Sequence, residues 1–445
     1  MKPLFYLNKY LYKYRLYLIG GIVFIICSNI FSLLIAPIVR TAIDSMISNI
    51  QIYTLLNFSK TEIAKHVSKL ALFFGSLVLA SALIKGVFMF FMRQTIIVMS
   101  RHIEFDLKNE IFAHYQKLDA SFYGKNYTGD LMNRISEDVS QVRMYLGPAI
   151  MYTINLVCMF ILVVSVMVSI NPTITFYVLL PLPILSLSIY YVSDIMNKRS
   201  TVVQGKLSQL TTFVQESFSG ILVLKAFAAE NHFSKKFGDE SEEYKHHYMN
   251  LVKVNALFFP LMMMLVGLSV IITIYFGGKQ VINGTFSFGN IAEYVIYVNM
   301  LTWPVASLGW VTSIIQRASA SQTRINAFLQ EKPENRSGKK LETFDKTIEF
   351  KDISFGYDQK LILENISFKI EKGKTLGIIG TTGSGKSSLA ALLMRMYSPK
   401  SGSITIDGQS VSDFELSFLP QPIWLCASRY FSFSESIVKH IVWHR

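Results

Sequence analysis

The stretch Gly380-Thr381-Thr382-Gly383-Ser384-Gly385-Lys386-Ser387-Ser388 decides how the C-terminal part of this chain folds. It fits the pattern G-x-x-x-x-G-K-[ST], in which consecutive backbone N–H groups wrap a chain of phosphates. Glycines are needed there because only they let the backbone come so close to the ligand. Lys386 would add a positive charge for the outer phosphates, and the Ser387 hydroxyl would hold Mg²⁺. We therefore predict that residues 380–388 bind a nucleotide; the alternative is a plain glycine turn.

The segments on either side of the loop support this prediction. Residues 374–380 form an apolar run that is typical of a buried parallel strand. Residues 387–396 are rich in strong helix formers, so we expect a helix there. A strand, a glycine loop and a helix N-terminus together make an anion site, because the first N–H groups of the helix point at the ligand.

The composition indicates a membrane protein. The chain has 445 residues, of which 51% are hydrophobic and 16% are charged, whereas a soluble domain carries about 25% charged residues. A net charge of +13 is compatible with a nucleic-acid partner. We assign it instead to the positive-inside rule, because the Lys and Arg residues lie mostly between apolar stretches, and we expect no nucleic acid. The cysteines at 27, 158 and 426 show no metal-binding spacing, so we expect neither a metal site nor a disulfide framework.

Six apolar stretches are candidates for helices that cross a bilayer. We place them at 16–39, 70–92, 148–170, 173–195, 257–275 and 290–314. The last is the weakest, because Glu293, Asn299 and Pro304 interrupt it. The first is too long for a signal peptide and lacks a small-residue cleavage site, so we expect it to be retained.

The connections between these stretches predict their orientation. Residues 93–147 and 196–256 are long, mostly polar and rich in Lys and Arg, whereas Asn171-Pro172 and residues 276–289 are short. The positive-inside rule places the long segments and both termini in the cytoplasm. Apolar residues at helical spacing, as at 207, 210 and 214, predict that the spans continue there as long helices.

A polar segment separates the membrane part from a soluble part. Residues 331–346 include Pro333 and Gly338, which predict a linker. Beyond it, residues 347–355 and 361–370 alternate like strands, and 403–407 is another short strand. We divide the chain into a membrane domain at 1–330, a linker at 331–346 and part of a nucleotide-binding domain at 347–445.

The whole pattern resembles a half-transporter of the ATP-binding-cassette (ABC) exporters. Thr128-Gly-Asp-Leu-Met-Asn-Arg134 looks like the first cytoplasmic loop of that family, Gln215-Glu-Ser-Phe-Ser-Gly-Ile221 looks like the second, and residues 316–321 look like the exit from the sixth span. The resemblance covers nearly the whole chain. It implies an α-helical polytopic membrane domain with six transmembrane helices and long cytoplasmic extensions, followed by a partial α/β P-loop nucleotide-binding domain.

The resemblance also implies roles for particular residues. Tyr357 matches the aromatic residue that stacks on adenine, and the alternative is a tyrosine that packs on the core. Residues 380–388 would bind ATP, with Mg²⁺ at Ser387. Short coupling helices near 122–128, and near 204–211 or slightly later, would press on the nucleotide domains.

The function that the resemblance implies is ATP-driven export of a lipid, drug-like or peptide substrate. Such a half-transporter works in the lipid bilayer as a homodimer or as a heterodimer with another half-transporter. We expect a multi-pass protein of the plasma (inner) membrane with both termini in the cytoplasm. The sequence does not identify the substrate.

The C-terminal part departs from the family pattern. The signature loop, the strand that ends in Asp with the catalytic Glu, and the switch His do not occur in the sequence. The resemblance therefore assigns no catalytic residue and leaves ATP hydrolysis uncertain. Leu419-Pro-Gln421 looks like the glutamine motif of the family, but the flanking segments place that glutamine at about Ser428.

The genetic code offers a reason for this departure. The codons GGC TAT GTG CCT CAA encode the family motif Gly-Tyr-Val-Pro-Gln and, shifted behind a T, encode Trp-Leu-Cys-Ala-Ser, as at 424–428. We hypothesise that 420–430 is read out of frame and that the nucleotide domain is truncated; the alternative is ordinary divergence. The rivals of an active exporter are then a truncated or frameshifted remnant and a non-transporting, nucleotide-binding membrane scaffold.

Overall fold

The computed structural model describes residues 2–334, 337–340, 345–357, 360–416 and 423. The chain forms two compact units, Met1–Leu107 with Asp138–Thr323 and Lys108–Glu137 with Arg324–Arg445. The segments at 419–421 and 424–428, on which the reading-frame hypothesis rests, lie outside the described residues.

Helices make up the first unit. They are η1 (Lys2–Leu7), α1 (Asn8–Lys13), α2 (Arg15–Leu33), α3 (Ile35–Leu55), α4 (Lys60–Tyr115), α7 (Val139–Met144), the π-helical turn η3 (Tyr145–Ala149), α8 (Ile150–Ile170), α9 (Pro172–Leu179), α10 (Pro181–Ser219), α11 (Ile221–Ala226), α12 (Glu230–Ile282) and α13 (Phe288–Leu329). Among the described residues, six helical segments are long and apolar enough to cross a membrane, which confirms the six predicted spans.

The long helices extend well beyond the predicted spans, as expected. α4, α10, α12 and α13 have 56, 39, 53 and 42 residues. α13 continues through Pro304, so this proline does not end the sixth span. The fourth span is divided instead, because Leu180 interrupts it between α9 and α10. Pro181 supplies no N–H to the helical hydrogen bonds, which favours a break at that point.

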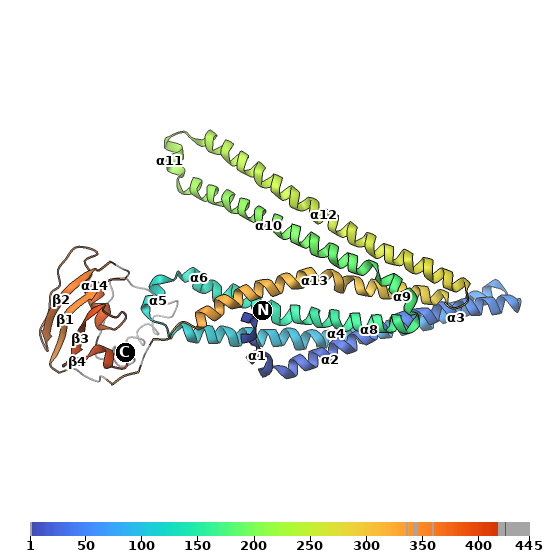
Figure 1. Cartoon of the computed structure of the whole chain (residues 1–445), viewed down its shortest axis with the longest axis horizontal. Helices are drawn as coiled ribbons and strands as arrows, with labels where there is room; N and C mark the ends of the chain where they lie inside the picture. Colours follow the sequence, from blue (N-terminus) through green and yellow to red (C-terminus); the bar gives the residue numbers. More distant parts are fainter. Residues whose placement is uncertain (1, 335–336, 341–344, 358–359, 417–422, 424–445) are drawn as a thin grey trace. The chain divides into compact units, whose positions relative to one another are not determined.

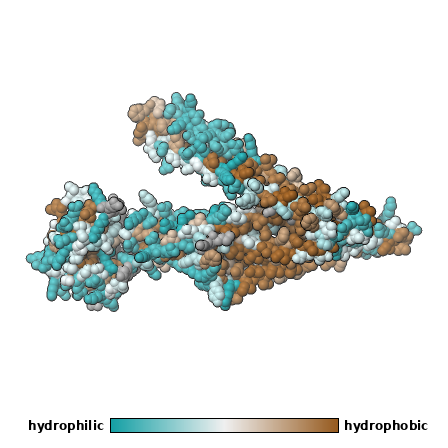
Figure 2. Space-filling view, in the orientation of Figure 1, coloured by the Kyte–Doolittle hydropathy of each residue, from teal (hydrophilic) through white to brown (hydrophobic). Residues whose placement is uncertain are grey.

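An apolar core holds one end of the first unit together. It combines Val163 of α8, Val178 of α9 and Leu301 of α13 with other buried side chains of these helices, of α10 and of α12. The outer surface of the helices is apolar too, as Leu72 and Leu79 show with 74% and 62% of their surface exposed. Figure 2 shows this hydrophobic surface along the helices of the first unit. A surface of this kind suits contact with lipid rather than water.

The helices α10 and α12 form a long hairpin that α11 closes (Figure 1). Lys206 pairs with Glu243 across it at 2.7 Å, and the rings of Phe213 and Phe233 stack with centroids 5.5 Å apart. The tip therefore lies at α11, whereas the sequence placed it near 204–211, a stretch inside α10, or slightly later. The helix runs through Gly205 and ends at Ser219, with Gly220 as its C-cap.

The second unit contains α5 (Ala120–Lys125), α6 (Thr128–Asn133), the π-helical turn η2 (Arg134–Asp138) and a four-stranded sheet. The strands are β1 (Thr347–Phe355), β2 (Leu363–Glu371), β3 (Ser401–Ile406) and β4 (Gln409–Ser410), in the order β2-β1-β3-β4 and all antiparallel. α14 (Lys386–Leu393) packs on this sheet through Leu389 and Leu392. A short 3-10 helix, η4 (Val411–Asp413), follows β4.

The structure differs from the sequence prediction at residues 374–380. This run lies outside the strands, and Ile379 is 99% exposed, so a buried parallel strand is not observed. The described sheet is antiparallel and offers this segment no neighbouring strand. The apolar side chains of Leu376 and Ile378 instead line an open pocket of about 400 Å³ beside Phe368.

Candidate functional site

The phosphate loop adopts backbone angles that favour glycine. Gly383 and Gly385 have φ values of +86° and +89°, in the left-handed region. A Cβ atom on Gly385 would also lie 2.7 Å from Cδ2 of Leu363, because the loop lies directly on β2. Glycine is therefore required at 385 both for the turn and for the close approach to the sheet.

Lys386 bends back over the loop. Its Nζ donates hydrogen bonds to the carbonyl oxygens of Gly380 and Thr381 at 2.8 and 2.7 Å, and it lies 3.5 Å from the hydroxyl of Ser384. These acceptors hold the ammonium group within the curve of the loop. Phosphate oxygens carry more negative charge than carbonyl oxygens, so a bound nucleotide would compete for the same donor.

The helix α14 begins at the end of the loop, which is the second feature of an anion site. Gly385 is its N-cap, and the amides of Ser388 and Leu389 donate to the carbonyl of Gly385. The first N–H groups of a helix have no partner within it and favour an anion. Ser387 is exposed at this first turn, as a Mg²⁺ ligand has to be, and Thr382 is exposed in the loop. The residues present therefore fit a magnesium nucleotide.

Tyr357 lies next to the loop. Its hydroxyl is 3.0 Å from the hydroxyl of Ser388, whose side chain is buried in α14. The ring is 49% exposed and meets Phe355 and Tyr397 edge-on, with centroids 5.1 Å away in both cases. About half of the tyrosine surface is therefore available for a ligand.

The structure thus brings Tyr357 together with the loop through Ser388. The sequence predicted Ser388 as a nucleotide ligand, whereas its hydroxyl here holds the tyrosine. Tyr397 is a neighbour that the sequence reasoning missed; no pattern identified it, since it follows the predicted helix. Burial raises the pKa of its phenol, and nearby Tyr357 and Asp119 raise it further, so Tyr397 stays neutral.

A pocket of about 630 Å³ within the second unit opens beside Tyr357. Asp119 and Lys125, at the two ends of α5, line one side, and Arg395 and Lys400 line another. Its size suits a small ligand. α5 is the short helix that the sequence expected near 122–128. It lines the same pocket as Tyr357, the predicted adenine platform.

Two family models match the chain. The ABC transporter transmembrane region matches residues 18–305, and the ABC transporter model matches residues 363–440. The second match includes the phosphate loop and implies ATP as the nucleotide.

Several curated proteins are similar to most of the chain. The uncharacterized ABC transporter ATP-binding protein YknU of Bacillus subtilis is 30% identical over 347 residues, which cover 76% of this chain and 59% of that protein. The ATP-dependent lipid A-core flippase of Syntrophus aciditrophicus is 29% identical, over 81% of this chain and 61% of its own. The probable multidrug resistance ABC transporter ATP-binding/permease protein YheI of Bacillus subtilis is 29% identical, over 76% and 58%. The chain thus spans about three fifths of the length of these relatives.

Proposed function

Because the chain belongs to the ABC transporters, we propose that it is an exporter half-transporter in which ATP at residues 380–388 drives a lipid, drug-like or peptide substrate across the membrane. It is a multi-pass membrane protein with a nucleotide-binding region after its transmembrane domain. One observation carries the proposal. The same chain contains six helices able to cross a membrane and a phosphate loop, and in that loop Lys386 and the N-terminus of α14 can bind an anion. We assign residues 1–330 to the membrane domain, 331–346 to the linker and 347–445 to the N-terminal part of a nucleotide-binding domain.

When bound at residues 380–388, ATP would supply binding energy for bringing two nucleotide-binding domains together. The chain's own residues would hold its phosphates through the loop amides and Lys386, and Mg²⁺ through Ser387. Tyr357 would support the adenine with its ring face. The assignment rests on the geometry of Gly380, Gly383, Ser384 and Gly385 around Lys386.

We propose a dimer as the working form, a homodimer or a heterodimer with another half-transporter. The tip of the α10–α12 hairpin supports this. Leu222, Val223 and Phe227 there are 82%, 62% and 80% exposed, although the flanking hairpin surface is hydrophilic (Figure 2). An apolar tip on a polar hairpin is suited to dock on another protein surface, and a nucleotide-binding domain of the second half-transporter is the occupant that we propose.

We place the protein in the plasma membrane with both termini in the cytoplasm. Basic residues support this orientation, since Lys2, Lys9, Lys13 and Arg15 precede the first span. The same rule puts α5 and α11 on the cytoplasmic side, where the nucleotide is.

The test is a reconstituted assay with the full chain in liposomes. ATP binding, ATP hydrolysis and movement of a fluorescent phospholipid and of a cationic dye would be measured on the same vesicles. Lys386→Ala should abolish ATP binding and every ATP-driven activity. Lys372→Ala is the matched control, because this lysine is 59% exposed and pairs with Asp345. ATP binding without hydrolysis or transport would favour the non-transporting scaffold or the remnant.

A further inference from the structure

A pocket of about 530 Å³ lies within the first unit, where side chains of α4, α8 and α13 line it together with Pro148. Its polar and aromatic lining includes Arg93 and Gln94 of α4, Tyr152 of α8 and Trp310 of α13. The rings of Tyr152 and Trp310 meet edge-on, with centroids 5.4 Å apart. A volume of this size suits a small ligand or the headgroup of a lipid.

The pocket lies at the level where three of the predicted spans end. Arg93 follows directly on the second span, at 70–92, and Trp310 lies near the end of the sixth, at 290–314. The third span, at 148–170, begins at the pocket with Pro148. Three separate stretches of sequence therefore place the pocket at the same boundary of the membrane. Trp and Tyr are typical of this boundary, because their rings are apolar and carry one polar group.

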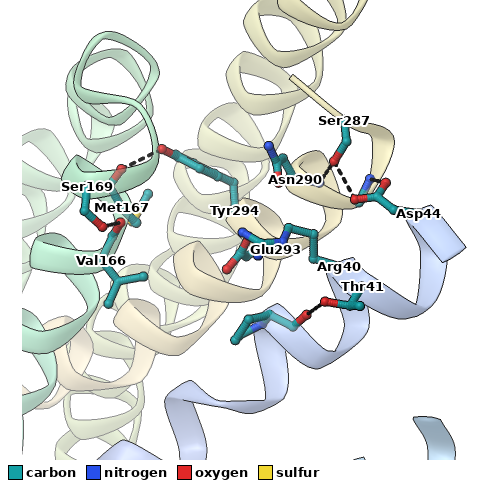
Figure 3. Close-up of polar contacts among 12 residues, drawn as sticks. Arg40, Thr41, Asp44, Val166, Met167, Ser169, Ser287, Asn290, Glu293 and Tyr294 are labelled. Carbon is teal, nitrogen blue, oxygen red and sulfur yellow. Dashed lines mark hydrogen bonds and ion pairs between the residues drawn. The ribbon is translucent and has the colours of Figure 1, made fainter. Parts of the chain in front are cut away.

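Arg93 has no partner in the part of the chain that the structure describes. Its guanidinium makes no ion pair or hydrogen bond there, and the side-chain amide of Gln94 and the hydroxyl of Tyr152 make none either. Arg40 differs, since its Nη1 lies 3.1 Å from Oε2 of Glu293, and Figure 3 shows these two side chains directed toward each other. The charge of Arg93 is thus available for an anion at the depth of the lipid headgroups.

An apolar strip leads from the pocket along α4 toward the middle of the second span. Its residues Leu83, Val87 and Phe90 are each more than half exposed. Their spacing of four and three residues places them on one side of the helix. Phe90 also lines the pocket, so the strip and the pocket are continuous. Acyl chains can lie on such a strip, whereas a soluble anion has no use for it, so the surroundings of Arg93 favour a lipid.

We propose that this pocket binds an anionic phospholipid, whose phosphate contacts Arg93 while its acyl chains lie on the strip of Leu83, Val87 and Phe90. Gln94 and Tyr152 donate hydrogen bonds to other oxygens of the headgroup. In the orientation proposed above, the lipid comes from the cytoplasmic leaflet, where basic pockets between membrane helices select anionic headgroups. Binding involves the membrane domain alone, so this proposal does not depend on ATP-driven export.

Quenching of Trp310 by brominated lipids measures occupation of the pocket directly. The full chain with Trp303, Trp424 and Trp443 replaced by phenylalanine keeps Trp310 as its only tryptophan. In nanodiscs, brominated phosphatidylglycerol should quench Trp310 with about fivefold higher apparent affinity than brominated phosphatidylcholine, because one basic residue at the membrane surface favours an anionic lipid by about this factor.

Matched variants test whether Arg93 causes this preference. Arg93→Gln should make the two lipids equivalent, whereas Arg93→Lys keeps the charge and should keep most of the preference. Lys69→Gln is the charge control, since Lys69 precedes the second span on the same helix and does not line the pocket. A chain that keeps only Trp303, which is 69% exposed on α13 outside the pocket, should be quenched equally by both lipids.

Several outcomes would overturn the proposal. Equal quenching of Trp310 by the two lipids would do so, as would a preference that Arg93→Gln retains or that Trp303 shares, because the whole surface would then select the lipid. No quenching by either lipid would mean that protein covers the pocket in the assembled molecule, which also contradicts the proposal.

An excess of soluble glycerol phosphate distinguishes the two sources of the anion. It should leave the quenching of Trp310 unchanged, because the acyl chains contribute to binding. Relief of quenching would show that the pocket binds a phosphate group alone and would overturn the assignment to a lipid. If the chain moves no substrate in liposomes, the proposed function fails, while the quenching measurement still decides about this site.

Discussion

At the scale of the residue, the loop depends on a glycine that no other residue replaces. Gly385 has φ near +89° and lies against Leu363 of β2. We predict that Gly385→Ala lowers ATP affinity at least tenfold, because the left-handed angle costs about 1–2 kcal/mol and the added Cβ displaces the loop. Gly377→Ala is the control, since nothing lies within 4 Å of its Cβ position. ATP titration of both variants would check this, and equal affinities would contradict it.

The second residue prediction concerns Tyr357. Stacking of an aromatic ring contributes about 0.5–1.5 kcal/mol, so Tyr357→Ala should weaken ATP binding about two- to tenfold. Tyr357→Phe keeps the ring and loses the contact with Ser388, so its affinity should stay close to that of the unmodified chain. Binding titrations separate the two roles. If Ala and Phe both bind ATP normally, the tyrosine serves only to pack on the core.

At the scale of the element, the β3–β4 hairpin turns at Asp407-Gly408, both with positive φ. The Asp407 carboxylate accepts hydrogen bonds from the amides of Asp345, Lys346 and Thr347. These bonds, chiefly those from Asp345 and Thr347, lower the pKa of Asp407 below 3.8. A lowered pKa means that the charged carboxylate stabilises the folded state at pH values above the pKa that Asp407 has in the unfolded chain. This stabilisation is lost as the pH falls through the pKa that Asp407 has in the folded chain.

The lowered pKa of Asp407 predicts how the stability of the hairpin depends on pH. In the full chain, Asp407→Asn should reduce the hydrogen-exchange protection of residues 345–347 at about pH 6, where the carboxylate is charged. The difference between the two chains should shrink as the pH is lowered towards about 2.5, because the carboxylate takes up a proton as the pH falls through its lowered pKa. Exchange followed by mass spectrometry measures both. An equally large difference at both values would rule out the charge as the cause.

The elements also show how far the sequence leads. The alternation at 347–355 predicted both ends of β1 correctly, and the long apolar stretches predicted the six membrane helices. Both succeeded because these signals depend only on residues that are neighbours in the sequence. The sequence located the tip at α11 only loosely, near 204–211 or slightly later, because periodicity shows which side of a helix is apolar but not where the helix ends. The partner of Glu293 was out of reach, because Arg40 lies 253 positions away and only the packing of α3 on α13 joins them. The sequence treated Glu293 as an interruption, whereas the structure makes it a buried half of an ion pair.

At the scale of the whole molecule, the proposed dimer can be tested at the tip of the α10–α12 hairpin. Leu222 and Phe227 are 82% and 80% exposed, so a partner that covers them would gain apolar burial. We predict that Leu222→Ser with Phe227→Ser weakens dimerisation by at least about 1 kcal/mol, roughly fivefold. ATP binding should be unchanged, because neither residue is near the loop in sequence or in the site described.

Mass photometry of the full chain in detergent would measure the dimer fraction for this prediction. Phe237→Ser is the matched control, since it is an exposed aromatic residue on the same hairpin but outside α11. Equal dimer fractions for the tip variant and the control would remove α11 from the interface.

The uninterrupted length of α4 has a mechanical consequence. With 56 residues, it measures about 84 Å at 1.5 Å per residue. The described residues of α4 include no proline, the commonest cause of a sharp bend. The helix therefore behaves as a lever. A tilt of about 5° moves one end by roughly 7 Å relative to the other, by the same geometry. A small change in tilt at one end of α4 thus becomes, at its other end, a movement as large as a side chain.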